Sequence, residues 1–116
     1  MLEIPLEVCQ NQSFMVTLNE QDCTIALYQR NSRLYLDLSV EGAVVRQGAV
    51  CLPQVGIVGD VPGFAGELFM IDLRTQPEKQ QPPQWEGLGT RWKLFYLFPE
   101  EVLVLRENAA QEALDG

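Results

Sequence analysis

The chain has 116 residues, of which 47% are hydrophobic and 21% are charged, a size and composition typical of one globular domain and incompatible with disorder throughout. The formal net charge is −8, and because nucleic-acid affinity comes mostly from Lys and Arg at phosphates, we expect no direct nucleic-acid binding. No apolar run approaches the roughly 18 residues that a membrane-spanning helix needs, so we also expect no membrane insertion.

The first half of the chain alternates between apolar and polar residues with a period of two, which predicts β-strands over 13–18, 22–28 and 33–40. The apolar faces of these runs are Phe14, Val16 and Leu18, then Cys23, Ile25 and Leu27, and then Leu34, Leu36, Leu38 and Val40. Polar segments about as long as hairpin loops separate the runs, so we expect a meander of antiparallel strands. Residues 43–52 continue the meander, with Gly48 at a predicted bulge.

Two long loops interrupt the second half of the chain. From Pro53 to Gly66, glycine and proline recur too often for any regular element. Residues 68–73 then predict a strand that is too apolar for clean alternation, as expected when both of its faces are covered. Residues 74–89 form a Pro/Gln-rich loop whose length indicates function or disorder. Trp85 lies in this loop, away from any predicted core face, so both a partner contact and local packing are open interpretations of it.

The last strand and the tail complete the predicted fold. Thr90–Phe98 predicts a strand that anchors the core, with Trp92, Leu94, Tyr96 and Phe98 on one face. After the apolar run Val102–Leu105, the tail could form about two turns of marginal helix. We therefore expect a single β domain over residues 1–105 and a C-terminal tail over 106–116. The predicted fold class is all-β, a small antiparallel β-barrel or sandwich of about six to eight strands, with a sheet backed by the C-terminal helix as the alternative.

The sequence lacks the residues that most active sites need. It contains no histidine, which removes the usual general base near neutral pH and most zinc and haem sites. The glycines of 53–66 are not followed by the Lys-Ser or Lys-Thr of a phosphate-binding loop, and no calcium-loop pattern appears. Cys9, Cys23 and Cys51 are odd in number and form no close Cys-x-x-Cys pair, so we expect reduced thiols, with Cys23 and Cys51 as small buried hydrophobes. We therefore expect no enzyme, no cofactor and no metal.

Several residues are candidates for contacts with a partner. Arg91 follows Gly89 on the outward face of its strand, so we expect its guanidinium to hold a carboxylate in a two-pronged pair. The candidate carboxylates are Asp72, Asp37 and one from a neighbouring chain, and a solvated arginine is the alternative. The loop 74–89 and the residues after Pro99 do not fit easily into a single core, so both are predicted to need a partner. The candidate interface residues are Arg74, Trp85, Arg91, Val102, Leu103, Val104 and Leu105.

Several short segments of the chain match those of a known family in their order and spacing. The segments are Ile4-Pro5-Leu6, Asn11-Gln12 followed by Phe14, Val16 and Leu18, Leu34-Tyr35-Leu36-Asp37-Leu38, and Leu88-Gly89 followed by Arg91, Leu94 and Tyr96. In these features the chain resembles the small baseplate plug proteins of contractile-tailed phages, known from a cyanophage assembly, over about residues 4–98. A Pro/Gln stretch replaces the Asp-rich approach to the Leu-Gly-x-Arg element of such proteins, and the tail beyond Pro99 lies outside the resemblance.

The resemblance implies a structural virion component that lies near the central axis of the baseplate and helps to close the tube lumen until contraction. Its expected partners are the hub, the spike, the tail tube and further copies of the chain about the tail axis, with assembly in the host cytoplasm.

The first 29 residues carry four acids and no base, unlike a secretory signal peptide, so export by that route is not expected. The alternative function is a stand-alone binding module, for instance for carbohydrate through Tyr35 and Trp85.

Overall fold

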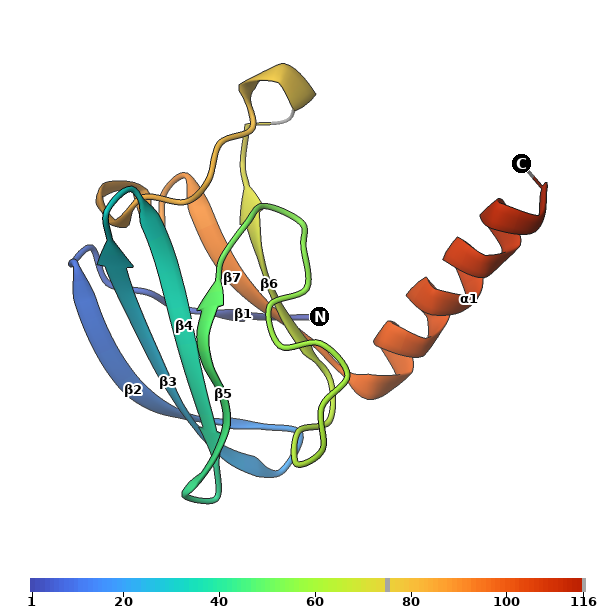
Figure 1. Cartoon of the computed structure of the whole chain (residues 1–116), viewed down its shortest axis with the longest axis horizontal. Helices are drawn as coiled ribbons and strands as arrows, with labels where there is room; N and C mark the ends of the chain where they lie inside the picture. The colour runs from blue at the N-terminus through green and yellow to red at the C-terminus, as the bar shows by residue number, and fades with distance from the viewer. Residues whose placement is uncertain (75, 116) are drawn as a thin grey trace.

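The computed structural model describes residues 1–74 and 76–115, which form two β-sheets and a C-terminal helix (Figure 1). The strands are β1 (Leu2–Ile4), β2 (Asn11–Leu18), β3 (Gln21–Arg30), β4 (Arg33–Val40), β5 (Ala43–Val50), β6 (Glu67–Asp72) and β7 (Trp92–Leu97). The helix α1 spans Pro99–Asp115, and two short 3-10 turns, Pro77–Lys79 and Trp85–Gly87, lie between β6 and β7. In the described chain the sheets do not join into a closed barrel, so the all-β prediction is confirmed in its sandwich form.

The first sheet is the predicted meander, with the strand order β2-β3-β4-β5. Two of its hairpins have two-residue turns with positive φ angles. The angles are 51° at Asn19 and 63° at Glu20 in the first turn, and 52° at Glu41 and 82° at Gly42 in the second. Turns of this kind match the right-handed twist of the strands that they join. Gly48 has a φ of 64° where β5 carries an extra residue relative to β4, so the predicted bulge is confirmed.

The second sheet has the order β1-β7-β6, with all its strands antiparallel. β7 is central, and Trp92, Leu94 and Tyr96 are buried as predicted. β1 is a strand that the sequence pattern did not predict, because three residues are too few to display a period. At the β6 end, Gly66 is required, since a Cβ there would lie 2.5 Å from the Leu97 carbonyl oxygen and the φ is 109°.

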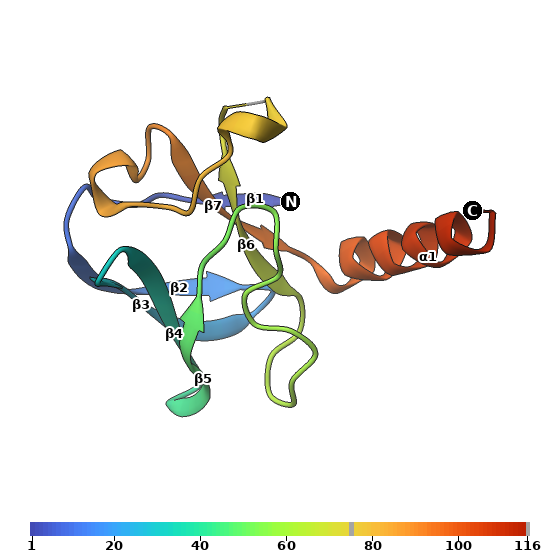
Figure 2. The same cartoon turned by 45° about the horizontal axis from the view of Figure 1, so that its top comes forward.

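The core lies between the two sheets, which face each other in Figure 2. Side chains from both sheets are fully buried there, including Ile25, Leu36 and Leu38 from the meander and Leu68, Met70 and Leu94 from the second sheet. The Gly-rich loop 53–66 closes one side of the core by contributing Ile57, Val58 and Phe64. Burial of each large aliphatic side chain stabilises the fold by about 1.5–3 kcal/mol, so these positions dominate its stability.

Two expectations are changed by the structure. The strand 68–73 was expected to be covered on both faces, but β6 buries one face and leaves Phe69 and Ile71 half-buried on the other. The helical tail is present, but α1 begins at Pro99, ahead of the expected tail of 106–116, and includes the run Val102–Leu105. That run is apolar enough to resemble a strand, which concealed the helix start. Both differences leave apolar side chains on the outer side of the second sheet.

Candidate assembly interface

The residues singled out from the sequence lie in two regions of the structure. Arg74, Trp85 and Arg91 all belong to the segment between β6 and β7. Val102, Leu103, Val104 and Leu105 belong to α1, which extends away from the sheets in both views (Figures 1 and 2).

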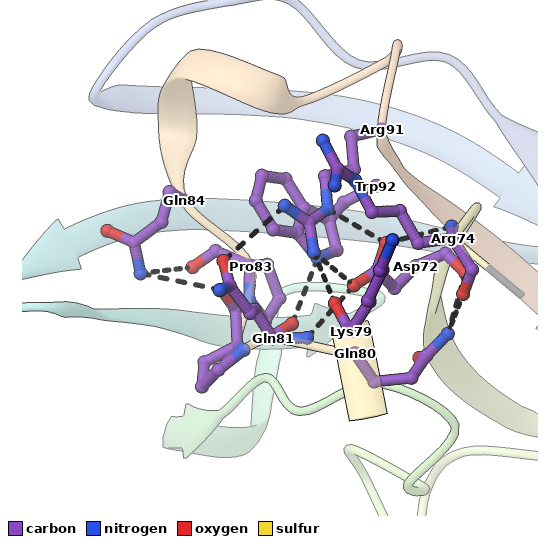
Figure 3. A network of polar contacts seen from close by, with 10 residues as sticks. Asp72, Arg74, Lys79, Gln80, Gln81, Pro83, Gln84, Arg91 and Trp92 are labelled. Carbon is purple, nitrogen blue, oxygen red and sulfur yellow. Dashed lines mark hydrogen bonds and ion pairs between the residues drawn. The ribbon is translucent and has the colours of Figure 1, made fainter. Parts of the chain in front are cut away.

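Arg91 forms the two-pronged pair that was predicted, and its partner is Asp72 (Figure 3). Arg91 Nε donates to Asp72 Oδ1 at 2.9 Å and Nη2 donates to Oδ2 at 2.8 Å. The backbone amides of Arg74 and Gln81 also donate to this carboxylate, at 3.1 and 2.9 Å. The Asp72 side chain has no exposed surface. The Arg91 guanidinium, assisted by the two amides, holds the pKa of Asp72 well below its usual range in spite of burial, so the carboxylate is charged.

The remaining donors of Arg91 fasten the loop to the second sheet. Nη2 donates to the Lys79 carbonyl at 2.8 Å, and the guanidinium lies 4.4 Å from the centre of the Trp92 ring. Trp92 Nε1 in turn donates to the Gln81 carbonyl at 3.1 Å. Cation–π contact and bidentate pairing together fix the guanidinium in one orientation. The first half of the loop is thus held by buried polar contacts within the chain.

The second half of the loop is held by the meander and by the core. Gln29 at the end of β3 accepts a hydrogen bond from the Trp85 amide at 2.8 Å and donates to Gln84 Oε1 at 2.8 Å. Leu88 is fully buried, and Trp85 is half-buried against the core. The expectations that this loop lacks a place in the core, and that Trp85 has no core face to join, are therefore wrong. Only local packing of Trp85, the alternative in the sequence analysis, is seen within the described chain.

The start of α1 follows the rules for helix N-termini. Pro99 occupies the first position, where its missing amide costs nothing, and Glu100 and Glu101 lie in the first turn, where the helix dipole favours acids. Glu101 accepts hydrogen bonds from the terminal ammonium of Met1 at 2.6 Å and from the Phe98 amide at 3.0 Å. These contacts lower the pKa of Glu101. This Pro-Glu-Glu signature is the signal from which the helix start could have been predicted.

The next turn of α1 is apolar on several sides and exposed. Leu103, Val104 and Leu105 are 57%, 53% and 54% exposed. Successive residues of an α-helix point about 100° apart, so these three side chains face three directions. A helix that is apolar all round is normally buried. This turn of α1 therefore has the composition of a buried helix, but no other part of the described chain covers it.

A groove of about 770 Å³ runs between α1 and the outer face of the second sheet. Its apolar lining comes from Phe69 and Leu97 on the sheet and from Val102, Val104 and Leu105 on the helix. Phe69 stacks on Phe95 with 5.8 Å between ring centres, so this face presents a continuous aromatic surface beside the groove. The exposed helix and the half-buried sheet face thus form one apolar region, which we call the α1 groove.

The aromatic residues of the carbohydrate alternative are not brought together. Tyr35 stacks on Tyr28 with 5.9 Å between ring centres, on the outer face of the meander. Trp85 is tied to Gln29, which follows the inward-facing Cys23, Ile25 and Leu27 along β3. The two aromatics therefore lie on opposite sides of the sheet and form no shared platform for a sugar ring.

Among the residues whose side chains the structure describes (1–74, 76 and 78–108), no group of three or more Cys, Asp or Glu side chains is arranged to bind a metal ion. Cys23 and Cys51 are buried thiols and Cys9 is half-buried, all of them free as predicted. Burial raises the pKa of Cys51 to about 12.

In the part of the chain that the structure describes, no helix is both long and apolar enough to cross a membrane.

The two-sheet body with an exposed apolar turn on its helix has the character of an assembly part. The family described as cyanophage baseplate Pam3 plug gp18 matches residues 1–100 of the chain. The chain belongs to this family of phage baseplate components, as the shorter resemblance over 4–98 had indicated. A search among curated proteins finds no match. The family match covers the whole sandwich and ends at the first turn of α1, so the exposed apolar turn lies beyond it.

Proposed function

We propose that the protein is a plug of a contractile tail, with several identical copies arranged about the tail axis near the hub and spike, where they help to close the tube lumen before contraction. Assembly takes place in the host cytoplasm, and hub, spike and tail tube are the partners. Membership of the baseplate plug family supports this position. The observation that carries the proposal is the exposed apolar turn of α1.

The geometry of α1 favours several partners over one. Leu103, Val104 and Leu105 face three directions, so a single flat surface would leave part of the turn exposed. Helices that converge on a common axis bury such a turn on more than one side. Copies of the chain, joined by hub or spike segments in the α1 groove, would provide this cover.

The loop 74–89 takes a secondary part in the proposed interface. Asp72 holds Gln81 and Gln29 holds Trp85, so this second part of the loop presents a surface that needs no ordering on assembly. Arg74 is exposed at its outer end, and the Arg91 side chain is 21% exposed. These cations are the positions at which acidic partner surfaces would contact the loop.

The net charge of −8 suits a plug in a channel that conducts DNA. An acidic surface repels phosphates, so it would block the lumen without retaining the genome.

A reconstruction of the assembled baseplate by cryo-electron microscopy tests the proposal. We expect density for the sandwich inside the lumen at the hub, with α1 buried against symmetry-related copies. In tails built with the Leu103→Ser, Leu105→Ser double variant, we expect incorporation to fall at least about tenfold.

Val44→Ser is the matched control, since Val44 is 63% exposed but lies on β5, away from α1. It should be incorporated normally. Density on the periphery of the baseplate, or equal incorporation of both variants, would contradict the proposed plug.

A further inference from the structure

The two sheets have four edges, and three of them are protected against pairing with another chain. β1 has three residues and is followed by Pro5. The edge of β6 is covered by the Gly-rich loop, since the amides of Gln54 and Ile57 donate to the carbonyls of Met70 and Leu68 at 2.7 and 2.8 Å. β5 contains Arg46 and two register shifts, which distort its open edge. Short edges, covering loops, charges and bulges are the usual protections of a sheet edge.

β2 has none of these protections, although it is the first strand of the meander and one of its sides is open. It pairs with β3 in an unbroken register from Asn11↔Tyr28 to Leu18↔Gln21. Its eight residues include no proline and no charged residue. A regularly paired, uncharged edge of this length is the kind of template that strand addition requires.

The backbone groups that face the open side of β2 can be assigned. The Gln29 amide donates to the Gln10 carbonyl at 3.1 Å, so Gln10 and every second residue after it bond to β3. The alternation turns the amides and carbonyls of Ser13, Met15 and Thr17 away from β3, toward the open edge. The chain before β2 is tied back by Gln12, which donates to the Glu7 carbonyl at 2.8 Å.

A hollow beside this edge provides places for side chains. Its volume is about 380 Å³, and its lining includes Leu6, Phe14 and Val16. Phe14 and Val16 are half-buried and lie on the inward face of β2, while Met15 on the outer face is 78% exposed. A strand added here would place its alternate side chains into the hollow and the others beside Met15.

We infer that the open edge of β2 is a docking site for an extended strand of a neighbouring baseplate protein, with apolar residues at alternate positions and Lys or Arg at its ends. The negative charge on both sides of β2 favours a strand with basic ends. Glu7 precedes the strand and Glu20 and Asp22 follow it, and the first 29 residues contain no base. A second copy of β2 in antiparallel pairing would place like charges opposite each other at both ends, whereas basic flanks would pair with them.

Amide hydrogen exchange on the free protein provides the first test, with NMR detection. The probe is a synthetic peptide of alternating threonine and valine with a lysine at each end, long enough to span β2. Without the probe, we expect slow exchange at Phe14 and Val16 and fast exchange at Ser13, Met15 and Thr17. With the probe at saturation, exchange at these three amides should slow by about tenfold or more. Unchanged exchange there, or protection confined to other strands, would overturn the inference.

Proline substitution provides the second test, because it removes one amide from a strand. Met15→Pro removes an amide that faces the open edge, so the fold should persist while the probe binds at least about tenfold more weakly. Val50→Pro is the control: Cys51 bonds to β4 through its amide at 2.8 Å, so the Val50 amide faces the open side of β5. The Val50→Pro variant should bind the probe as tightly as the unmodified chain does. Equal binding by both variants would overturn the assigned edge.

Two further results would overturn the choice of occupant. One is equal affinity for the same peptide with glutamate at its ends. The other is a free chain that dimerises and becomes monomeric with Met15→Pro, as measured by sedimentation.

The Leu103→Ser, Leu105→Ser variant separates this inference from the proposed plug, since it should keep full affinity for the probe.

Discussion

The loop 74–89 and the helix α1 gave rise to the same expectation from the sequence but differ in structure. Both carry apolar residues that no alternating strand accounts for, and both were expected to need a partner. The loop proves to be held by the chain itself, through Asp72, Gln29 and the buried Leu88. The described part of α1 leaves Leu103 and Leu105 more than half exposed. The loop, which has buried polar anchors, is thus part of the fold, whereas the apolar turn of α1 is left uncovered.

The comparison has a physical basis. A buried charge is tolerated where it is fully paired, and Asp72 is a site of this kind because four donors converge on it. Apolar side chains on a helix have no such directional partners. Any apolar surface that covers them stabilises the helix, whether it comes from the same chain or from another. Four measurements test whether the loop and the helix differ in this way.

Asp72→Ala should have the largest effect. It removes the acceptor shared by Arg91 and two loop amides, so the free energy of unfolding should fall by about 2–4 kcal/mol. Urea denaturation measures this change. Glu3→Ala is the control, since Glu3 pairs with Lys93 at 3.5 Å on the surface and should matter little. Similar losses for the two variants would show that the loop does not depend on Asp72.

The next largest effect should come from low pH, which protonates Asp72 and so weakens the contacts that hold the loop. The pKa of Asp72 is lowered in the folded chain, so its contribution is complete above the carboxyl pKa of the unfolded chain and is lost as the pH falls toward the lower folded value. Stability should therefore decline below about pH 4. Unfolding midpoints from neutral pH down to about pH 2 would show this decline. In Asp72→Asn the decline should be smaller, and an unchanged acid dependence would contradict the assignment.

Gln29→Ala should have a smaller effect on the same loop. The variant loses the hydrogen bonds to Trp85 and Gln84, and the expected cost is about 1–2 kcal/mol. Trp85 should become more exposed, which tryptophan fluorescence detects as a red shift. Gln47→Ala, at an exposed position on β5, is the control and should leave the spectrum unchanged. An unchanged spectrum for Gln29→Ala would mean that Trp85 is held by packing alone.

The Leu103→Ser, Leu105→Ser variant should have the smallest effect on the free chain. Because both side chains are exposed, the free energy of unfolding should change by no more than about 0.5 kcal/mol. Leu88→Ala, at a fully buried position, should instead cost about 2–5 kcal/mol. A large loss in the α1 variant would show that the helix packs on its own sandwich, and the contrast between the two regions would disappear.

The meander was predictable because its alternation is a local property of the sequence. The inward positions Ile25, Leu27 and Leu36 and the bulge at Gly48 follow from neighbouring residues alone. The partner of Arg91 was not determined in this way, since Asp72 and Asp37 were equally available. The register of the second sheet decides between them, because it places Asp72 opposite Trp92, next to Arg91.

The α1 groove was missed for a related reason. Val102–Leu105 was identified as a candidate interface, but its position beside Phe69 and Leu97 depends on the path of the chain after β7. Gln29 and Glu101 were missed as anchors because glutamine and glutamate are common at exposed positions. The tie from Gln29 spans more than fifty residues of sequence.

The Asp72–Arg91 pair also determines where the chain can tolerate insertions. The pair closes the segment between β6 and β7, and the contacts at Arg74 and Lys79 fix both ends of its outer part. Loop closure becomes only slowly more costly with length, by about 0.6 kcal/mol for each doubling. We therefore expect a foreign peptide inserted after Gln76 to be displayed on the surface while both sheets keep their register.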